Sequence, residues 1–162
     1  MTVDTVIEDA RWRALDLPAL AVRAEGEALR FLGMDPEAWD VSLLGCDDAR
    51  IAALNTQFRG KATPTNVLSW PSDERGAEVP GGAPIPPDSD DPELGDIAIA
   101  YETCLREAET GGLALETHAT HLIVHAVLHL LGYDHETDAD AALMEGHETA
   151  ILARLGISDP YA

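Results

Sequence analysis

The stretch HAVLHLLGYDH, residues 125–135, places three histidines and a glycine at the end of the longest apolar run of the chain. His125 and His129 are four residues apart, and four residues of an α-helix turn the chain by about 400°. Their rings therefore project from one helix face with Cβ atoms roughly 6 Å apart, close enough to bind one ion at Zn–N distances of about 2.0–2.1 Å. Gly132 permits the left-handed conformation that ends a helix, so the chain can reverse and bring His135 to the same ion. The pattern predicts a metal site on three histidines with a fourth position open to water, as catalytic zinc sites have.

The spacing of these histidines is also that of zinc proteases of the HExxH type, but Ala126 stands where those enzymes carry their catalytic glutamate. Peptide hydrolysis needs a base for the water and an acid for the amine leaving group. A protease is therefore disfavoured unless a carboxylate from elsewhere replaces the missing one. Phosphodiester cleavage instead needs positive charge against developing negative oxygens. Three neutral ligands leave the ion its full double charge, so the site favours chemistry at phosphate.

His118 and His121 extend the histidine stripe, since positions 118, 121, 125 and 129 advance by three or four residues. We expect these two to support the site by hydrogen bonds to the ligands or to the substrate. For His118, packing in a helix interface is an equally good interpretation.

Arg59, Gly60 and Lys61 form a second candidate element within LNTQFRGKATPTNVLSWP, residues 54–71. In a loop between a helix and a strand, the two cations could bind a phosphate, Arg59 through two parallel hydrogen bonds. The alternative is an ordinary solvated pair after a helix end, where cations are favoured. The residue types alone leave both interpretations open.

The composition limits the classes of partner and the compartment. Thirty acidic against ten basic residues give a formal net charge of −20. Any RNA contact must therefore be local, a broad basic nucleic-acid face is excluded, and we do not expect DNA binding.

The run of residues 122–131 is too short to cross a bilayer, and the N-terminus lacks a secretory signal. Cys46 and Cys104 are predicted to be reduced thiols of a cytoplasmic protein, with a single disulfide as the alternative.

The hydrophobic pattern predicts one domain over residues 1–162, of α+β (α/β-like) class. We expect a small mixed sheet of about four strands packed with about five helices. Residues 71–92 hold most of the prolines and an acidic run, and their composition predicts a solvated, mobile loop. The predicted strands are Val3–Ala10, Val41–Leu44, Asn66–Trp70 and Gly95–Ala100. The predicted helices are Leu17–Leu32, one from Asp47 or Asp48 to about Phe58, a short one through Arg106, Leu115–Leu131, and Asp138–Leu155, capped by Thr137 or Asp138.

Both motifs resemble those of the YbeY family of bacterial endoribonucleases. Residues 125–135 match its H-G-x-L-H-L-x-G-Y-D-H signature, and residues 55–71 are similar to its second signature, N-x-x-[FYW]-R-x-K-D-x-P-T-[DN]-V-L-S-[FW]-P. The resemblance extends from about residue 40 onward. It includes LGDI at residues 94–97, both further histidines, and Met144, Glu145 and Glu148 of the last helix. Two departures are Ala126 in place of a glycine, and Ala62 with Thr63 in place of an Asp-Lys-like pair.

Membership implies one zinc ion on His125, His129 and His135 and cleavage of single-stranded RNA. It also implies trimming of the 3′ end of small-subunit rRNA and ribosome quality control, with the ribosome or ribosomal proteins as partners. Arg59 corresponds to an arginine that the family places near the metal as a substrate contact, and Lys61 is a second candidate. The catalytic base stays open between His121, another water and the 2′-hydroxyl of RNA.

A rival interpretation is a zinc-stabilised ribosome-assembly factor that binds without cutting. The acidic charge is compatible with basic protein partners. A fourth protein ligand, such as Asp134 or Cys46, would favour this interpretation, whereas an open water position would favour the enzyme.

Overall fold

The computed structural model describes residues 3–60 and 63–161. Within this part of the chain, four strands form one sheet and five α-helices surround it, so the predicted α+β single-domain fold is confirmed. The strands are β1 (Val3–Ile7), β2 (Asp40–Cys46), β3 (Val67–Pro71) and β4 (Glu93–Ala100). The α-helices are α1 (Leu17–Phe31), α2 (Asp48–Arg59), α3 (Tyr101–Gly111), α4 (Leu115–Leu130) and α5 (Asp138–Arg154). Two short 3-10 helices are η1 (Ala10–Leu15) and η2 (Pro36–Ala38).

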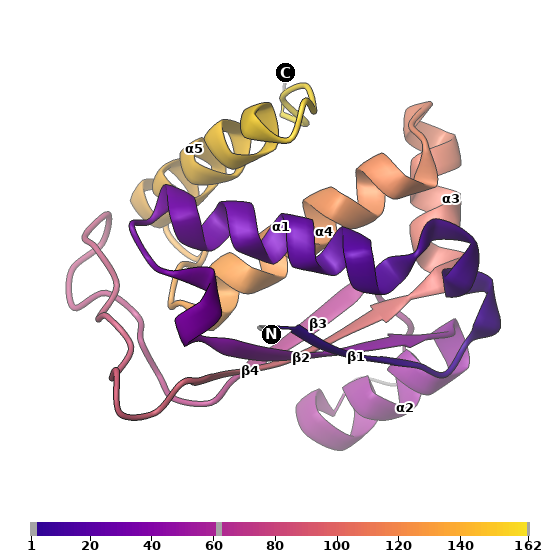
Figure 1. Cartoon of the computed structure of the whole chain (residues 1–162), viewed down its shortest axis with the longest axis horizontal. Helices are drawn as coiled ribbons and strands as arrows, with labels where there is room; N and C mark the ends of the chain where they lie inside the picture. The colour runs from indigo at the N-terminus through magenta and orange to yellow at the C-terminus, as the bar shows by residue number, and fades with distance from the viewer. Residues whose placement is uncertain (1–2, 61–62, 162) are drawn as a thin grey trace.

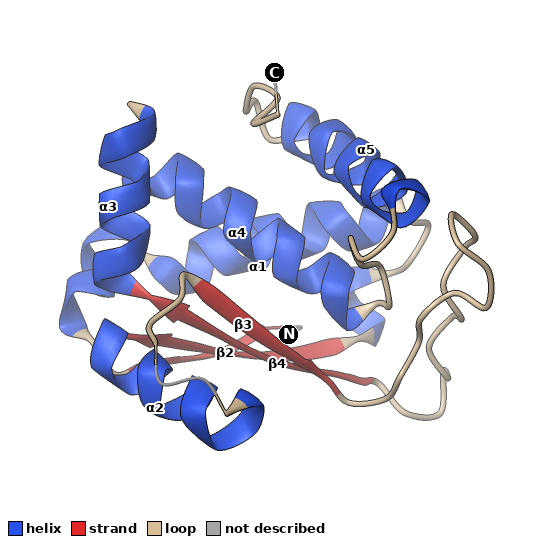
Figure 2. Cartoon of the chain, turned by 180° about the vertical axis from the view of Figure 1, so that it is seen from behind, coloured by secondary structure: helices blue, strands red, loops and turns tan. Residues whose placement is uncertain are grey.

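The sheet is mixed, with the strand order β1-β2-β4-β3. The first three strands in this order are parallel, and β3 pairs antiparallel with β4 at the edge. Helices α1 and α4 lie on one face of the sheet, and α2 lies on the other (Figure 1). From behind, β3 runs beneath α4 (Figure 2), so the edge strand lies next to the helix that carries the histidines.

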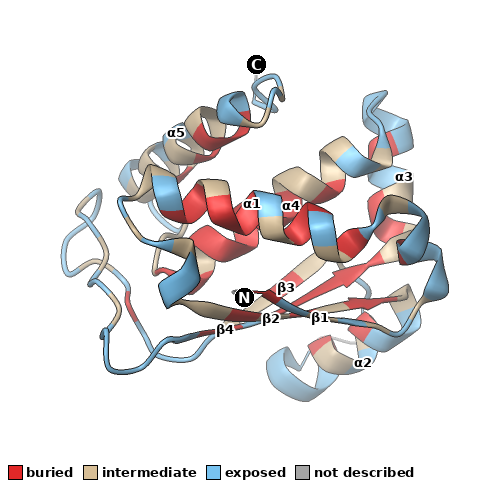
Figure 3. Cartoon of the chain, viewed as in Figure 1, coloured by how far each residue is buried: buried red, intermediate tan, exposed pale blue. Residues whose placement is uncertain are grey.

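The main core fills the space between the sheet, α1 and α4, where the buried segments meet (Figure 3). Helix α4 packs against α1, α3, α5 and the sheet. Burial on several sides explains why its sequence is so apolar between the histidines. Residues buried along α4 include Ile123, Val124, Val127 and Leu128.

Side-chain caps fix the starts of two helices as predicted. The carboxylate of Asp47 accepts a hydrogen bond from the backbone N–H of Arg50 at 2.8 Å. The hydroxyl of Thr137 accepts one from the N–H of Asp140 at 3.1 Å and begins α5. Each cap satisfies a donor that the first helical turn leaves unpaired.

The N-terminal strand is shorter than predicted. It was expected to reach Ala10, but β1 ends at Ile7 and η1 begins at Ala10. Asp9 ends the extended conformation because its carboxylate accepts a hydrogen bond from the N–H of Arg11 at 3.0 Å. Trp12 is then fully buried and donates its indole N–H to the carbonyl of Cys46 at 3.0 Å.

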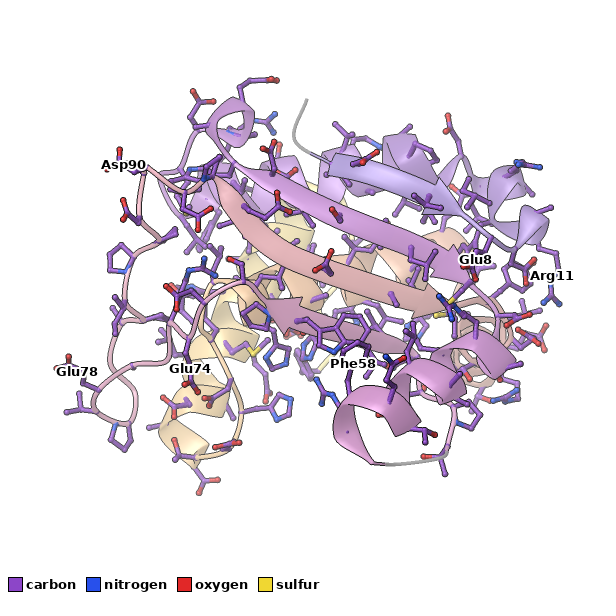
Figure 4. The ribbon with its side chains drawn as sticks, turned by 90° about the horizontal axis from the view of Figure 1, so that it is seen from below. Glu8, Arg11, Phe58, Glu74, Glu78 and Asp90 are labelled. Atoms are coloured by element: carbon purple, nitrogen blue, oxygen red, sulfur yellow. The ribbon has the colours of Figure 1, made fainter. Side chains whose placement is uncertain are left out.

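Residues 72–92 contain no helix or strand, and Glu78 and Asp90 project away from the domain (Figure 4). Arg75 is the exception in this acidic loop, since it is only 5% exposed. Its guanidinium donates to the carbonyls of Leu130 at 2.7 Å and Leu94 at 3.3 Å. The loop is thus tied to the C-terminal end of α4, and its mobility stays a prediction.

Both cysteines are free and buried, which confirms reduced thiols and rules out the alternative of a disulfide. Burial raises the pKa of Cys46 to about 12 and also raises the pKa of Cys104. Within residues 3–60 and 63–161, no helix combines the length and the hydrophobicity needed to span a bilayer.

Candidate metal centre

The three predicted ligands lie together in space. Each of His125, His129 and His135 offers a ring nitrogen, and these atoms lie within 4.8 Å of one another. The Nε2 atoms of His125 and His129 are 3.0 Å apart. Tetrahedral zinc with Zn–N distances of about 2.0–2.1 Å would separate its ligand nitrogens by roughly 3.3 Å. The arrangement and the donor type therefore fit one zinc ion.

Gly132 makes this arrangement possible at the end of α4. Its φ is +101°, a conformation that L side chains rarely adopt. A Cβ at this position would also lie 2.3 Å from the carbonyl oxygen of Arg75. Glycine is thus required both for the turn that returns His135 to the helix and for the close approach of the loop.

Glu148 of α5 contacts one of the three candidate ligands, His125. Its side chain is fully buried, and its Oε1 lies 2.5 Å from Nδ1 of His125. A hydrogen bond at Nδ1 fixes the tautomer and leaves Nε2 as the nitrogen for a metal. Burial would raise the pKa of Glu148, but hydrogen bonds from His121, His125 and Tyr161 lower it to about 2. The group is therefore a carboxylate at neutral pH.

The role of Glu148 was missed in the sequence, where it appeared only as part of a similar C-terminal helix. A signal was present, because Met144, Glu148, Ile151 and Leu152 form the buried stripe of α5. An acid in such a stripe needs partners, since an unpaired buried charge is costly.

His129 is suited to metal binding because its ring is neutral. Burial lowers its pKa to about 4, and the neighbouring rings of His125 and His135 contribute in the same direction. A neutral imidazole keeps a lone pair free for a metal, whereas a protonated one does not.

The ligands line a cleft of about 510 Å³ between α4, β3 and the turn after α4. Arg59, at the end of α2, lines the same cleft, and its guanidinium donates to the carbonyl of Ser69 on β3 at 3.4 Å. His121 and Ala126 also line it. The structure places Arg59 and His121 in the same cleft as the candidate metal group of His125, His129 and His135, and their catalytic roles stay predictions. Lys61 lies outside the described residues.

The two supporting histidines differ in position. Nε2 of His121 lies 3.1 Å from Oε2 of Glu148, so His121 shares a carboxylate with the candidate ligand His125. Nε2 of His118 lies 2.8 Å from a carboxylate oxygen of Glu107 on α3. The geometry thus favours a supporting role for His121 and helix packing for His118.

The two candidates for a fourth ligand do not join the group. Cys46 is buried with the residues under α2, and its thiol lies 3.5 Å from the carbonyl of Ile99. Asp134 lines the cleft, but it is not among the residues whose ligand atoms gather within 4.8 Å. Within the described part of the chain, the group could offer a metal ion three histidine nitrogens, which would leave a fourth position for a water or a substrate oxygen.

Comparison with known proteins identifies the family of the chain. The family model for Endoribonuclease YbeY matches residues 8–156. A relative from Dinoroseobacter shibae named Endoribonuclease YbeY is 60% identical over 163 residues, which cover 99% of this chain and 90% of that protein. A relative of the same name from Ruegeria pomeroyi is 58% identical over 164 residues, covering 99% of this chain and 98% of that protein.

A solved structure shares the fold. The solution structure of TM1509 from Thermotoga maritima superposes with a TM-score of 0.57 at 21% identity and covers 98% of each chain. The match of the family model over most of the sequence and the high identity of both relatives settle the classification. The chain belongs to the Endoribonuclease YbeY family.

Proposed function

We propose that this protein is a zinc-dependent endoribonuclease that cleaves single-stranded RNA, and that it acts in 3′-end maturation of small-subunit rRNA and in ribosome quality control. Family membership supports the nuclease activity. The observation that carries the zinc dependence is the group of three imidazoles facing a cleft that also contains Arg59.

His125, His129 and His135 would hold the ion, and Glu148 would keep the ring of His125 oriented. A bound zinc ion supplies Lewis acidity, which stabilises negative charge on a phosphate oxygen and lowers the pKa of a coordinated water. The described residues offer the ion only neutral ligands in this group, so its charge stays available to the phosphate.

Arg59 would bind the phosphate next to the cleaved bond. A guanidinium presents a planar set of donors that matches two phosphate oxygens. Because the chain carries a formal charge of −20, its contacts with RNA must be concentrated where cations gather. The cleft lining contains Arg59 but also Asp134 and Glu136, so the local positive charge would come from Arg59 together with the bound ion.

His121 is the candidate base. It lines the cleft, and the carboxylate of Glu148 stabilises the cation that forms when the ring takes a proton. If the 2′-hydroxyl of RNA is the nucleophile instead of water, the products carry cyclic phosphates. Analysis of product ends therefore distinguishes the two routes.

The test compares wild-type protein with His129→Ala on an end-labelled single-stranded RNA and on the same RNA annealed to its complement. We expect the wild type to cut the single strand after zinc loading, and the variant to lose at least about 10³-fold in rate, since metal stabilisation of the transition state contributes several kcal/mol. The variant, purified identically, also controls for contaminating ribonucleases. Equal rates in both proteins would overturn the proposal.

The place in rRNA maturation needs its own test in cells. A strain depleted of this protein should accumulate small-subunit rRNA with extended 3′ ends, and wild-type protein should restore the mature end where His129→Ala does not. Restoration by the variant would show that the role in maturation is independent of cleavage.

A further inference from the structure

The last described residues, 155–161, fold back toward the cleft instead of continuing away from α5. Gly156 has a φ of +76° and reverses the chain, which curls at the end of α5 in Figure 2. The carboxylate of Asp159 then accepts hydrogen bonds from the hydroxyl of Thr149 at 3.2 Å and from the N–H of Tyr161 at 2.8 Å. These contacts fix the backbone at Tyr161.

The hydroxyl of Tyr161 reaches the support of the metal group. It donates a hydrogen bond to Oε2 of Glu148, the oxygen that also contacts His121. Burial raises the pKa of Tyr161, and the neighbouring carboxylate of Glu148 raises it further, so the hydroxyl keeps its proton. Tyr161 is thus a neutral donor to the fully buried carboxylate behind His125.

The ring of Tyr161 forms a wall of the cleft. It lies edge to face with the ring of His121, with centroids 5.8 Å apart, and the residue remains 47% exposed. Arg59 lines the same cleft. The space next to the histidines therefore offers a partly exposed aromatic ring as well as a guanidinium.

We propose that Tyr161 is a substrate-positioning residue, whose ring stacks on a nucleobase of RNA in the cleft and whose hydroxyl fixes Glu148 behind the metal ligand His125. The inference rests on the proposed function, because it assumes that RNA enters this cleft. It goes beyond that function by assigning the C-terminal tail a role in binding.

Base stacking is a way for a protein with a formal net charge of −20 to bind RNA, because stacking does not depend on positive charge. Every nucleobase has a π-face, so an aromatic side chain binds single strands without a preference for sequence and without a cation. The loss of one stacking contact weakens binding by about 5- to 150-fold. Paired bases of a duplex are not available to stack on a protein side chain, so the same contact favours single-stranded RNA.

The first test measures RNA binding by protein saturated with zinc, before measurable cleavage, through fluorescence anisotropy of a labelled single-stranded oligonucleotide. We expect Tyr161→Ala to weaken binding by about tenfold, while Tyr161→Phe, the matched control that keeps the ring, binds like wild type. Tyr161→Leu retains apolar bulk against His121 and should behave like the alanine variant, which separates loss of stacking from loss of packing. Thermal melting verifies that each variant is folded.

Binding of oligonucleotides that each lack one base distinguishes stacking by Tyr161 from a purely structural role of this residue. Oligonucleotides that lack one base, at each position in turn, should show one position where the missing base weakens binding to wild type and to Tyr161→Phe but not to Tyr161→Leu. The salt dependence gives a second readout, because Arg59→Ala should reduce it and Tyr161→Leu should leave it unchanged.

The hydroxyl is tested by zinc affinity. Tyr161→Phe should weaken zinc binding, by less than the roughly 10- to 100-fold that loss of a direct partner of a metal ligand causes. Unchanged zinc affinity would overturn the role of the hydroxyl.

Two outcomes separate this inference from the proposed function. If wild type cleaves RNA while Tyr161→Leu binds RNA with wild-type affinity and the same positional profile, the stacking role is wrong and the nuclease proposal stands. If wild type neither binds nor cleaves single-stranded RNA, both are wrong.

Discussion

The three candidate metal ligands and the three groups that fix their surroundings differ in how they are arranged along the sequence. The ligands occupy the short stretch at residues 125–135. Their supports come from three separate segments, namely Arg75 in the acidic loop, Glu148 on α5 and Tyr161 near the C-terminus. A local motif can therefore reveal the chemistry of a site, whereas only the fold reveals what fixes its geometry.

The largest effect is expected where the ligand stretch meets the acidic loop, at Gly132. Gly132→Ala should lower the free energy of unfolding by roughly 3 kcal/mol, because the new Cβ is strained by the positive φ and clashes with the carbonyl of Arg75. Gly33→Ala is the matched control, since Gly33 also has a positive φ but open space around it. It should cost about 1 kcal/mol. If urea unfolding shows the same loss of unfolding free energy for Gly132→Ala and Gly33→Ala, the close approach of the acidic loop to Gly132 is contradicted.

The second effect concerns the support on α5. Glu148→Gln should weaken zinc binding by about 10- to 100-fold, because the neutral amide no longer stabilises the ring of His125 in its ligating orientation. Competition with a chromophoric chelator measures the affinity. Glu116→Gln, at an exposed carboxylate on α4, should leave zinc affinity unchanged. A Glu148→Gln variant with wild-type zinc affinity would show that the ligands need no support from α5.

A smaller effect is expected at Arg75. Arg75→Ala removes the donors to the carbonyls of Leu94 and Leu130, so the free energy of unfolding should fall by about 1–2 kcal/mol. Arg30→Ala removes an exposed ion pair with Glu27 and should cost at most about 1 kcal/mol. If the two variants unfold at the same urea concentration, the loop does not anchor α4.

The smallest effect is expected at Cys46, which lies in the separate cluster under α2. Burial raises its pKa to about 12, so the thiol is almost entirely protonated at pH 8. Native protein should therefore resist alkylation at this pH, and zinc should not change the rate, whereas urea-unfolded protein should react. Protection that appears only with zinc would show that Cys46 is a metal ligand.

The contrast between features set by a short stretch of sequence and features set by distant segments also explains how much of the fold could be predicted from the sequence. The order of strands and helices and the caps at Asp47 and Thr137 followed from short-range patterns, which a single sequence displays. The early end of β1 was missed because an Asp9 side chain competes with the strand for backbone hydrogen bonds. Such competition depends on local geometry rather than on hydrophobic period.

In the candidate site, too, the residues within one short stretch could be predicted, whereas those on other segments could not. The spacing of the histidines predicted the group that the structure contains. Glu148 and Tyr161 could not be placed beside it, because their positions depend on how α5 and the tail pack against α4. Arg59 was placed near the metal only through the family resemblance, and its distance from the histidines along the sequence gave no geometric constraint.

The most direct test of the central claim is X-ray absorption spectroscopy at the zinc edge of protein loaded with one equivalent of zinc. Three imidazole nitrogens and one oxygen at about 2.0–2.1 Å are expected, together with the multiple-scattering pattern of three rings. A sulfur ligand near 2.3 Å, or fewer than three imidazoles, would contradict a site made by His125, His129 and His135.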